Sequence, residues 1–265
     1  MPLLTAGADT IIVEPRCEIS GRALELAAEL NIYIFITSAG GLKLYSWFPP
    51  PAAFRNIDKQ VQCLADPVRA GAVARHMVRG RFGREFHPAH PVSVLRGYEG
   101  SQVKQIYRRL AREHGIEWPG RQLNGRWDEL DPLNRCISMC NAALYSVAEI
   151  AILRAGFTPW LGIIHDRLAN GGKSFVYDIA DLVKFEQITP VAFRHAASEK
   201  SHPEWRARAE CGRLFRTTEF INELTRLTTE AISVGTNYIP GNAPHRSGKN
   251  LSGCLAGHRP SQRKR

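Results

Sequence analysis

Three consecutive prolines, Pro49–Pro51, divide the chain into two parts with different residue patterns. Proline fixes its own φ angle and pushes the preceding residue out of the helical region, so neither a helix nor a central strand continues through such a run. We expect a stiff hinge over residues 49–55. A fold for this chain therefore has to be assembled from two segments that meet at this hinge.

The residues before the hinge favour β-strands. Thr10–Val13 and Tyr33–Thr37 are short β-branched and aromatic runs, and Leu42–Ser46 alternates apolar and polar residues. A helical pattern lies between the first two runs, with Ser20 as its expected N-cap. Three strands and one helix are few for a domain that stands alone. We therefore expect further strands upstream, or a partner chain that completes the sheet.

The residues after the hinge favour helices almost to the end of the chain. The expected helices are Asn56–Phe82, Val92–His114, Leu133–Ala155, Phe175–Phe185, Pro190–Ala197 and Glu204–Ala231. The sequence thus predicts an α+β fold, in which a small N-terminal β-rich domain (residues 1–48) precedes a larger all-α domain (residues 56–240).

Positive charge is concentrated in two regions. The net charge is +10, and residues 241–265 hold six Arg or Lys and no acid. This Gly-, Ser- and Pro-rich segment predicts a basic disordered tail. Between Asp66 and Arg112, ten basic residues stand against three acids. Such a density favours a polyanionic partner, most simply nucleic acid, although solvated helix faces explain it equally well.

Other features exclude several classes of protein. The six cysteines form no CxxC pair and no regular spacing, which argues against a zinc ribbon and a disulfide framework. We expect Cys136 and Cys140 to be small buried residues. No stretch approaches the roughly 20 apolar residues of a membrane span, and the N-terminus lacks the pattern of a secretion signal. The expected location is cytoplasmic, with no membrane partner.

Asp178 and Asp181 lie in an otherwise apolar stretch, Phe175–Phe185. In a helix, residues three apart share a face, so both carboxylates would point the same way. Two buried carboxylates are costly unless a cation or strong donors meet them, and a hard divalent metal provides that compensation. The alternative is a solvent-facing first turn, in which acids offset the helix dipole.

Two further residues extend this candidate site. Glu99 lies among basic residues, where it either pairs with Arg96 or Lys104 or serves as a metal ligand. His165 follows an apolar run, where a histidine is more often a buried core residue than a ligand. A set of Glu, His and Asp would suit magnesium or manganese and would support phosphodiester chemistry.

Four motifs together resemble the CRISPR-associated integrase, the spacer-acquisition endonuclease, and most closely its type I-E subfamily. The matching segments are Arg96-Gly-Tyr-Glu-Gly-Ser-Gln-Val, Asn134-Arg-Cys-Ile-Ser with Leu144-Tyr145, Gly162-Ile-Ile-His165, and Ser174-Phe-Val-Tyr-Asp-Ile-Ala-Asp-Leu-Val-Lys-Phe185. Their order and spacing agree with the family from about Glu14 to Arg216.

The resemblance implies an N-terminal β domain joined to an α-helical catalytic domain. It implies a homodimer that assembles with a small ferredoxin-like CRISPR-associated partner protein. The assembly would capture double-stranded DNA with single-stranded ends and insert it into CRISPR repeat DNA. In this reaction a 3′-hydroxyl attacks a phosphodiester, with Mg²⁺ or Mn²⁺ as the cofactor.

The resemblance also assigns roles to individual residues. Glu99, His165 and Asp181 match the metal ligands, and Asp178 matches a fourth catalytic acid. The positions that match DNA-contacting residues are Lys43, Trp127, Tyr145, Arg213 and Arg216, of which Trp127 is the weakest correspondence because its loop differs in length.

The chain also departs from the family pattern. Roughly the first forty residues that the resemblance implies are absent, so we expect an incomplete N-terminal β domain. The turn between His165 and Asp178 is longer than the resemblance implies. Two alternatives therefore stay open: a non-catalytic DNA-binding scaffold, and a stand-alone structure-specific nuclease.

Overall fold

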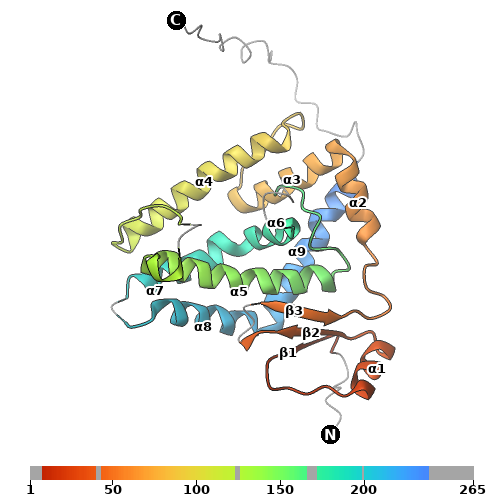
Figure 1. Ribbon diagram of the computed structural model, residues 1–265. Coiled ribbons are helices and arrows are strands. Elements are labelled where there is room, and N and C mark those ends of the chain that lie inside the picture. The colour runs from red at the N-terminus through yellow and green to blue at the C-terminus, as the bar shows by residue number, and fades with distance from the viewer. Residues whose placement is uncertain (1–7, 40–42, 123–125, 166–171, 199, 239–265) are drawn as a thin grey trace, which may run out of the picture.

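The computed structural model describes residues 8–39, 43–122, 126–165, 172–198 and 200–238 (Figure 1). The predicted tail over residues 241–265 lies outside the described residues. The predicted domain limits, 1–48, 49–55 and 56–240, stay a prediction.

A three-stranded sheet forms the N-terminal part. Its strands are β1 (Thr10–Val13), β2 (Tyr33–Thr37) and β3 (Leu44–Phe48), and α1 (Gly21–Glu29) connects the first two. The order is β1-β2-β3, in which β2 pairs parallel to β1 and antiparallel to β3. Ser20 caps α1, as predicted, by accepting a hydrogen bond from the amide of Ala23. The third strand lies two residues further along the chain than the sequence indicated.

The rest of the described chain is helical. The helices are α2 (Ile57–Ala65), α3 (Pro67–Phe82), α4 (Val92–Glu113), α5 (Pro132–Arg154), α6 (Ser174–Val183), α7 (Thr189–Ala196), α8 (Pro203–Phe215) and α9 (Thr218–Thr236). Short 3₁₀ and π segments cover Trp127–Glu129 and Lys184–Ile188.

Two of the expected helices are each split in the structure. The segment Asn56–Phe82 breaks at Asp66, which precedes Pro67 in an extended conformation and caps α3 through the amide of Val68. The segment Glu204–Ala231 breaks at Thr217, an extended residue whose hydroxyl accepts from the amide of Phe220. In both places a local capping signal ends a continuous apolar pattern.

The helix α5 forms the centre of the core. It contacts α6, α7, α8 and α9, and its residues are mostly buried (Figure 1). By length and hydropathy alone, α5 is long and apolar enough to cross a membrane. The expectation that no stretch of the sequence approaches the composition of a membrane span was therefore wrong. However, 78% of its apolar window is buried inside the protein, which is typical of the core helix of a globular fold.

The sheet packs against the C-terminal half of α5. Tyr33 and Phe35 of β2 and Leu44 of β3 form one buried cluster with Ile150 and Leu153 of α5. In Figure 1 the sheet lies along one side of the helical part, and α4 lies on the opposite side. The chain therefore builds one continuous body in which α5 joins the sheet to the helices that carry the candidate site.

The packing of α9 against α2 and α3 depends on a glycine. A Cβ at Gly235 would lie 2.6 Å from both Cys63 Sγ and Val73 Cγ2. We predict that Gly235→Ala lowers the free energy of unfolding by about 1–3 kcal/mol through overpacking, measured by urea denaturation. Gly212→Ala in α8, where no atom of the described residues lies within 4 Å of the added Cβ, is the matched control and should not destabilise the protein. Equal stability of the two variants would contradict this view of the α3–α9 contact.

Candidate metal centre

The carboxylate of Asp178 holds the segment that carries His165. Its Oδ2 accepts hydrogen bonds from the amides of Ile163 (2.5 Å) and Ile164 (3.1 Å). Its Oδ1 accepts from the His165 amide at 2.9 Å and lies 2.7 Å from His165 Nδ1. Asp178 is fully buried, so these donors replace the water that its charge has lost. One side chain of α6 thereby fixes three consecutive residues of the preceding segment.

Gly162 allows this segment to approach α6. Its amide donates to Ser174 Oγ at 2.9 Å, and Ser174 Oγ in turn donates to the carbonyl of Trp160. A Cβ at Gly162 would lie 2.7 Å from Ser174 Cβ, and Cβ atoms in proteins essentially never come this close to another heavy atom. The glycine in the Gly162–His165 motif is therefore required by packing.

Asp178 also sets the chemical state of His165. With Nδ1–H donating to Asp178, the lone pair of Nε2 is free, and Nε2 lies 3.9 Å from Asp181 Oδ2. Burial lowers the pKa of His165, but the hydrogen bond and charge of Asp178 and the charges of Asp181 and Glu99 outweigh it, so the pKa is raised. The arrangement is typical of a histidine that a carboxylate orients toward a metal.

Glu99, His165 and Asp181 come together from three parts of the chain. Glu99 lies on α4 and Asp181 on α6, one turn after Asp178. One potential ligand atom from each of the three lies within 4.8 Å of the others. Glu99 and Asp181 are buried and His165 is half-buried. Two carboxylate oxygens and one imidazole nitrogen form a donor set that fits a magnesium or manganese ion.

Two cations balance the carboxylates of this cluster. Arg81 Nη1 forms a short ion pair with Glu99 and lies 3.6 Å from Asp181 Oδ2, while Lys184 Nζ bonds Asp181 Oδ1. Burial raises the pKa of Glu99, and Arg81 opposes this only in part. Burial also acts to raise the pKa of Asp181, but Lys184, Arg81 and His165 together hold it below its ordinary value. Asp181 is therefore the more firmly ionised of the two.

Sequence reasoning missed both cations. Lys184 follows Asp181 by three residues, so helical spacing could have indicated the pair. Arg81 was expected only as part of the helix Asn56–Phe82, with no partner assigned. In the structure it lies in the last turn of α3, which ends before Gly83 in a left-handed conformation. Of the two interpretations of Glu99, one paired it with Arg96 or Lys104, and its partner in the structure is Arg81 instead. Arg96 Nε donates to the carbonyl of Ile164.

The cluster opens into a cavity of 380 Å³ between α4, α6 and the segment that ends at His165. Charged and apolar side chains both line this cavity. Its lining residues are Arg96, Glu99, Gly100, Val103, Tyr107, Ile164, His165, Asp181, Lys184 and Phe185.

The predicted DNA-contacting residues lie in three separate places. Lys43 and Tyr145 line a second cavity, and Lys184 Nζ lies 6.0 Å from the ring centroid of Tyr145. Trp127 is 46% exposed. Arg213 is exposed on α8, and Arg216 forms an ion pair with Glu14 at 3.4 Å beside β1. Of the five, none lines the cavity that contains Glu99.

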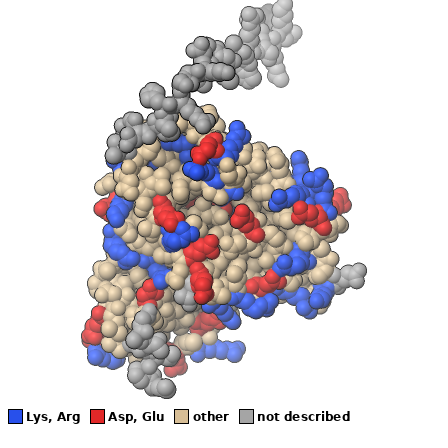
Figure 2. Space-filling view, turned by 180° about the vertical axis from the view of Figure 1, so that it is seen from behind, with Lys and Arg blue, Asp and Glu red and all other residues tan. Residues whose placement is uncertain are grey.

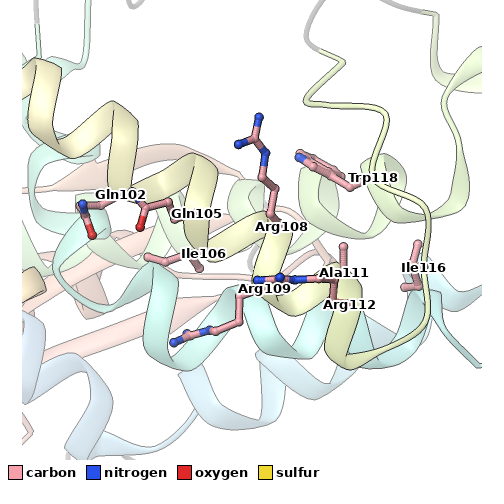
Figure 3. A pocket seen from close by; sticks show the side chains of 9 residues that line it. All are labelled: Gln102, Gln105, Ile106, Arg108, Arg109, Ala111, Arg112, Ile116 and Trp118. Atoms are coloured by element: carbon pink, nitrogen blue, oxygen red, sulfur yellow. The ribbon is translucent and has the colours of Figure 1, made fainter.

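A row of basic residues follows α4 away from the site. Arg96 and Gly100 line the metal cavity, and Lys104, Arg108 and Arg112 continue the same i, i+4 row along the helix. Arg108 and Arg112 line a third, open cavity of 740 Å³, which Trp118 also lines (Figure 3). The ring of Trp118 stacks on the ring of Tyr107, with 4.9 Å between the ring centroids. On the face seen in Figure 2, by contrast, acidic and basic residues are interspersed.

Comparisons with known proteins agree with this geometry. Residues 83–205 match the family model described as CRISPR associated protein Cas1. The CRISPR-associated endonuclease Cas1 3 of Methanospirillum hungatei is 36% identical over 239 residues, which cover 89% of this chain and 78% of that protein. The chain belongs to the Cas1 family.

Further Cas1 proteins extend the similarity to sequence and structure. The CRISPR-associated endonuclease Cas1 of Escherichia coli K12 is 34% identical over 231 residues, which cover 85% of this chain and 73% of that protein. A crystal structure of a TtCas1–DNA complex superposes with a TM-score of 0.75 at 30% identity, covering 88% of this chain and 86% of that one. The matched Cas1 region contains all four residues Glu99, His165, Asp178 and Asp181.

We predict that Asp178→Asn lowers the free energy of unfolding by about 2–4 kcal/mol, because an amide group cannot accept all the donors that converge on this carboxylate. Urea denaturation measures the loss. Asp58→Asn, an exposed acid in the first turn of α2, is the control and should cost less than about 1 kcal/mol. A loss at Asp178 no larger than at Asp58 would show that Asp178 does not hold the His165 segment.

Proposed function

We propose that this Cas1 chain is a metal-dependent DNA integrase and endonuclease of CRISPR adaptation. The observation that carries the proposal is the cluster of Glu99, His165 and Asp181, in which Asp178 orients the imidazole. Membership of the Cas1 family supports the reaction class, in which a 3′-hydroxyl attacks a phosphodiester and short DNA is inserted into a repeat array.

The residues of the cavity have distinct proposed roles. Glu99, His165 Nε2 and Asp181 hold one Mg²⁺ or Mn²⁺ ion, which supplies Lewis-acid stabilisation to the reacting phosphate. Asp178 positions His165 and, in the neutral ring, fixes the tautomer in which the Nε2 lone pair is available to a metal. Lys184 holds Asp181 in an ionised state and adds positive charge to the cavity wall. Gly100 leaves room beside the metal ligands for the sugar-phosphate backbone, since no described residue lies within 4 Å of its Cβ position.

DNA is proposed to reach this cavity along basic surfaces. The row Lys104, Arg108 and Arg112 begins next to the metal cavity, so it provides a path for the phosphates of a strand that leaves the site. TtCas1, which shares the fold at 30% identity, has been crystallised with DNA. The remaining proposed DNA contacts are those that the sequence indicated: Lys43, Trp127, Tyr145, Arg213 and Arg216.

The assembly proposed for this chain follows the family resemblance. It is a homodimer that works with a small ferredoxin-like CRISPR-associated partner and that acts on duplex DNA with single-stranded ends and on CRISPR repeat DNA. The type I-E subfamily, the cytoplasmic location and the division into a β-rich domain and an α-helical catalytic domain are parts of the same proposal.

We predict that Glu99→Ala, His165→Ala and Asp181→Ala each lower the rate of DNA joining by at least about 100-fold, because each removes one proposed metal ligand. The assay joins a short labelled duplex to a repeat-bearing plasmid in the presence of the partner protein and Mg²⁺ or Mn²⁺. Filter binding in the absence of divalent metal should show DNA affinity within a few-fold of the wild-type value.

Glu113→Ala is the matched control for Glu99, because Glu113 is an exposed acid on the same helix and pairs only loosely with Arg109. It should join DNA at the wild-type rate. A normal rate for His165→Ala would contradict the proposed site.

We predict that the double variant Arg108→Ala/Arg112→Ala reduces the slope of log K against log salt concentration for DNA binding by about 2, because two phosphate contacts are lost. Fluorescence anisotropy at several salt concentrations measures this slope. The double variant Arg22→Ala/Arg226→Ala removes the same charge from α1 and α9 and serves as the control. Equal slopes for the two double variants would show that the α4 row does not contact phosphates.

A further inference from the structure

Arg81 lies inside the cluster of proposed metal ligands. Its side chain is 1% exposed, and it approaches from the last turn of α3. Nη1 forms a short ion pair with Glu99 Oε1 and lies 3.6 Å from Asp181 Oδ2. The guanidinium thus contacts two of the three residues that would bind the ion, on helices that meet only in the folded protein.

The guanidinium of Arg81 is only partly satisfied where it lies. Nε donates to the carbonyl of Met77 over a long distance, 3.4 Å, and buried Nη2 has no hydrogen-bond partner among the described residues. A buried donor without a partner is unfavourable, so one strong ion pair to Glu99 holds the group against this cost. Arginine does not lose its proton in proteins, so the positive charge remains whatever else binds.

A charge count shows what a divalent ion would meet. Within the network of ion pairs, the carboxylates of Glu99, Asp178 and Asp181 contribute −3 and the side chains of Arg81 and Lys184 contribute +2, which leaves −1 with His165 neutral. Arg96 lines the cavity but donates to the carbonyl of Ile164, so it lies outside this network. Adding a divalent cation changes this sum to +1. Adding one DNA phosphate then returns it to zero. Without Arg81, the metal alone already brings the sum to zero.

We propose that Arg81 couples metal binding to DNA binding, because its charge leaves the metal-loaded cavity positive until a DNA phosphate enters. The proposal rests on the proposed function, since it takes Glu99, His165 and Asp181 as the metal ligands. In the absence of metal, Arg81 neutralises Glu99 and Asp181 and keeps the site folded. When the ion binds, the positive charge of Arg81 repels it. A negatively charged DNA phosphate then offsets this repulsion. Metal and DNA therefore bind with positive cooperativity, and the coupling acts equally in both directions.

The test measures Mn²⁺ affinity by titration with electron paramagnetic resonance detection of free Mn²⁺, with and without a short DNA duplex that has single-stranded 3′ ends. For the wild-type chain we expect DNA to strengthen Mn²⁺ binding at least tenfold. For Arg81→Gln we expect tighter binding than wild type in the absence of DNA, and a DNA effect of less than threefold. No turnover is needed for this measurement.

Arg69→Gln is the matched control, because Arg69 lies on the same helix and is partly buried. Its partners among the described residues are the carbonyls of Gly235 and Thr236 and the carboxylate of Asp66. It should retain the wild-type coupling. Arg81→Lys keeps the positive charge in the same place, so it should also retain the coupling between Mn²⁺ and DNA binding. This variant tests the proposal if Arg81→Gln does not fold. Loss of coupling in Arg81→Lys with the fold intact would overturn the proposal.

The outcomes separate this proposal from the proposed function. If the wild-type chain binds Mn²⁺ but Arg81→Gln shows unchanged or weaker affinity and an unchanged DNA effect, the coupling role is wrong and the metal site stands. If the wild-type chain binds no Mn²⁺ at this site, the metal assignment fails, and the coupling role fails with it.

Discussion

The burial of negative charge is the constraint on which the candidate site depends. Asp178, Asp181 and Glu99 lose most of their water in the fold, and each is stabilised by a different kind of partner. Backbone amides and an imidazole meet Asp178, Lys184 meets Asp181, and Arg81 meets Glu99. These partners come from three separate parts of the chain, so the site forms only when the helices have packed. Function and folding therefore depend on the same electrostatic balance.

The architecture brings these partners together through α5 and its neighbours. The sheet packs against one end of α5, and α6 also packs against α5. This arrangement brings Asp181 of α6 close to Glu99 of α4. The segment that ends at His165 is then fixed by a glycine contact on one side and by Asp178 on the other. A histidine held in this way has one nitrogen committed to a carboxylate and the other directed at Asp181. These different surroundings of its two ring nitrogens distinguish His165 from a histidine that only fills the core.

Much of this could be predicted from the sequence, for reasons that are local. The strands, the cap at Ser20 and the apolar setting of Asp178 and Asp181 depend on residues close together in the chain. The two split helices were missed because capping at Asp66 and Thr217 interrupts a pattern that remains apolar on both sides. The pairing of Arg81 with Glu99 could not be predicted at all, because it depends on how α3 packs against α4 and α6. The five proposed DNA contacts follow from the resemblance alone, and their roles stay predictions.

The most direct test of the central claim is a crystal structure of the full chain grown with Mn²⁺, in which anomalous scattering locates the ion. The account predicts one strong anomalous peak about 2.0–2.3 Å from a Glu99 carboxylate oxygen, His165 Nε2 and an Asp181 oxygen. It also predicts that Asp178 still accepts the amides of the His165 segment. Anomalous peaks only at exposed acids, with Arg81 still paired to Glu99 and no ion beside His165, would contradict it.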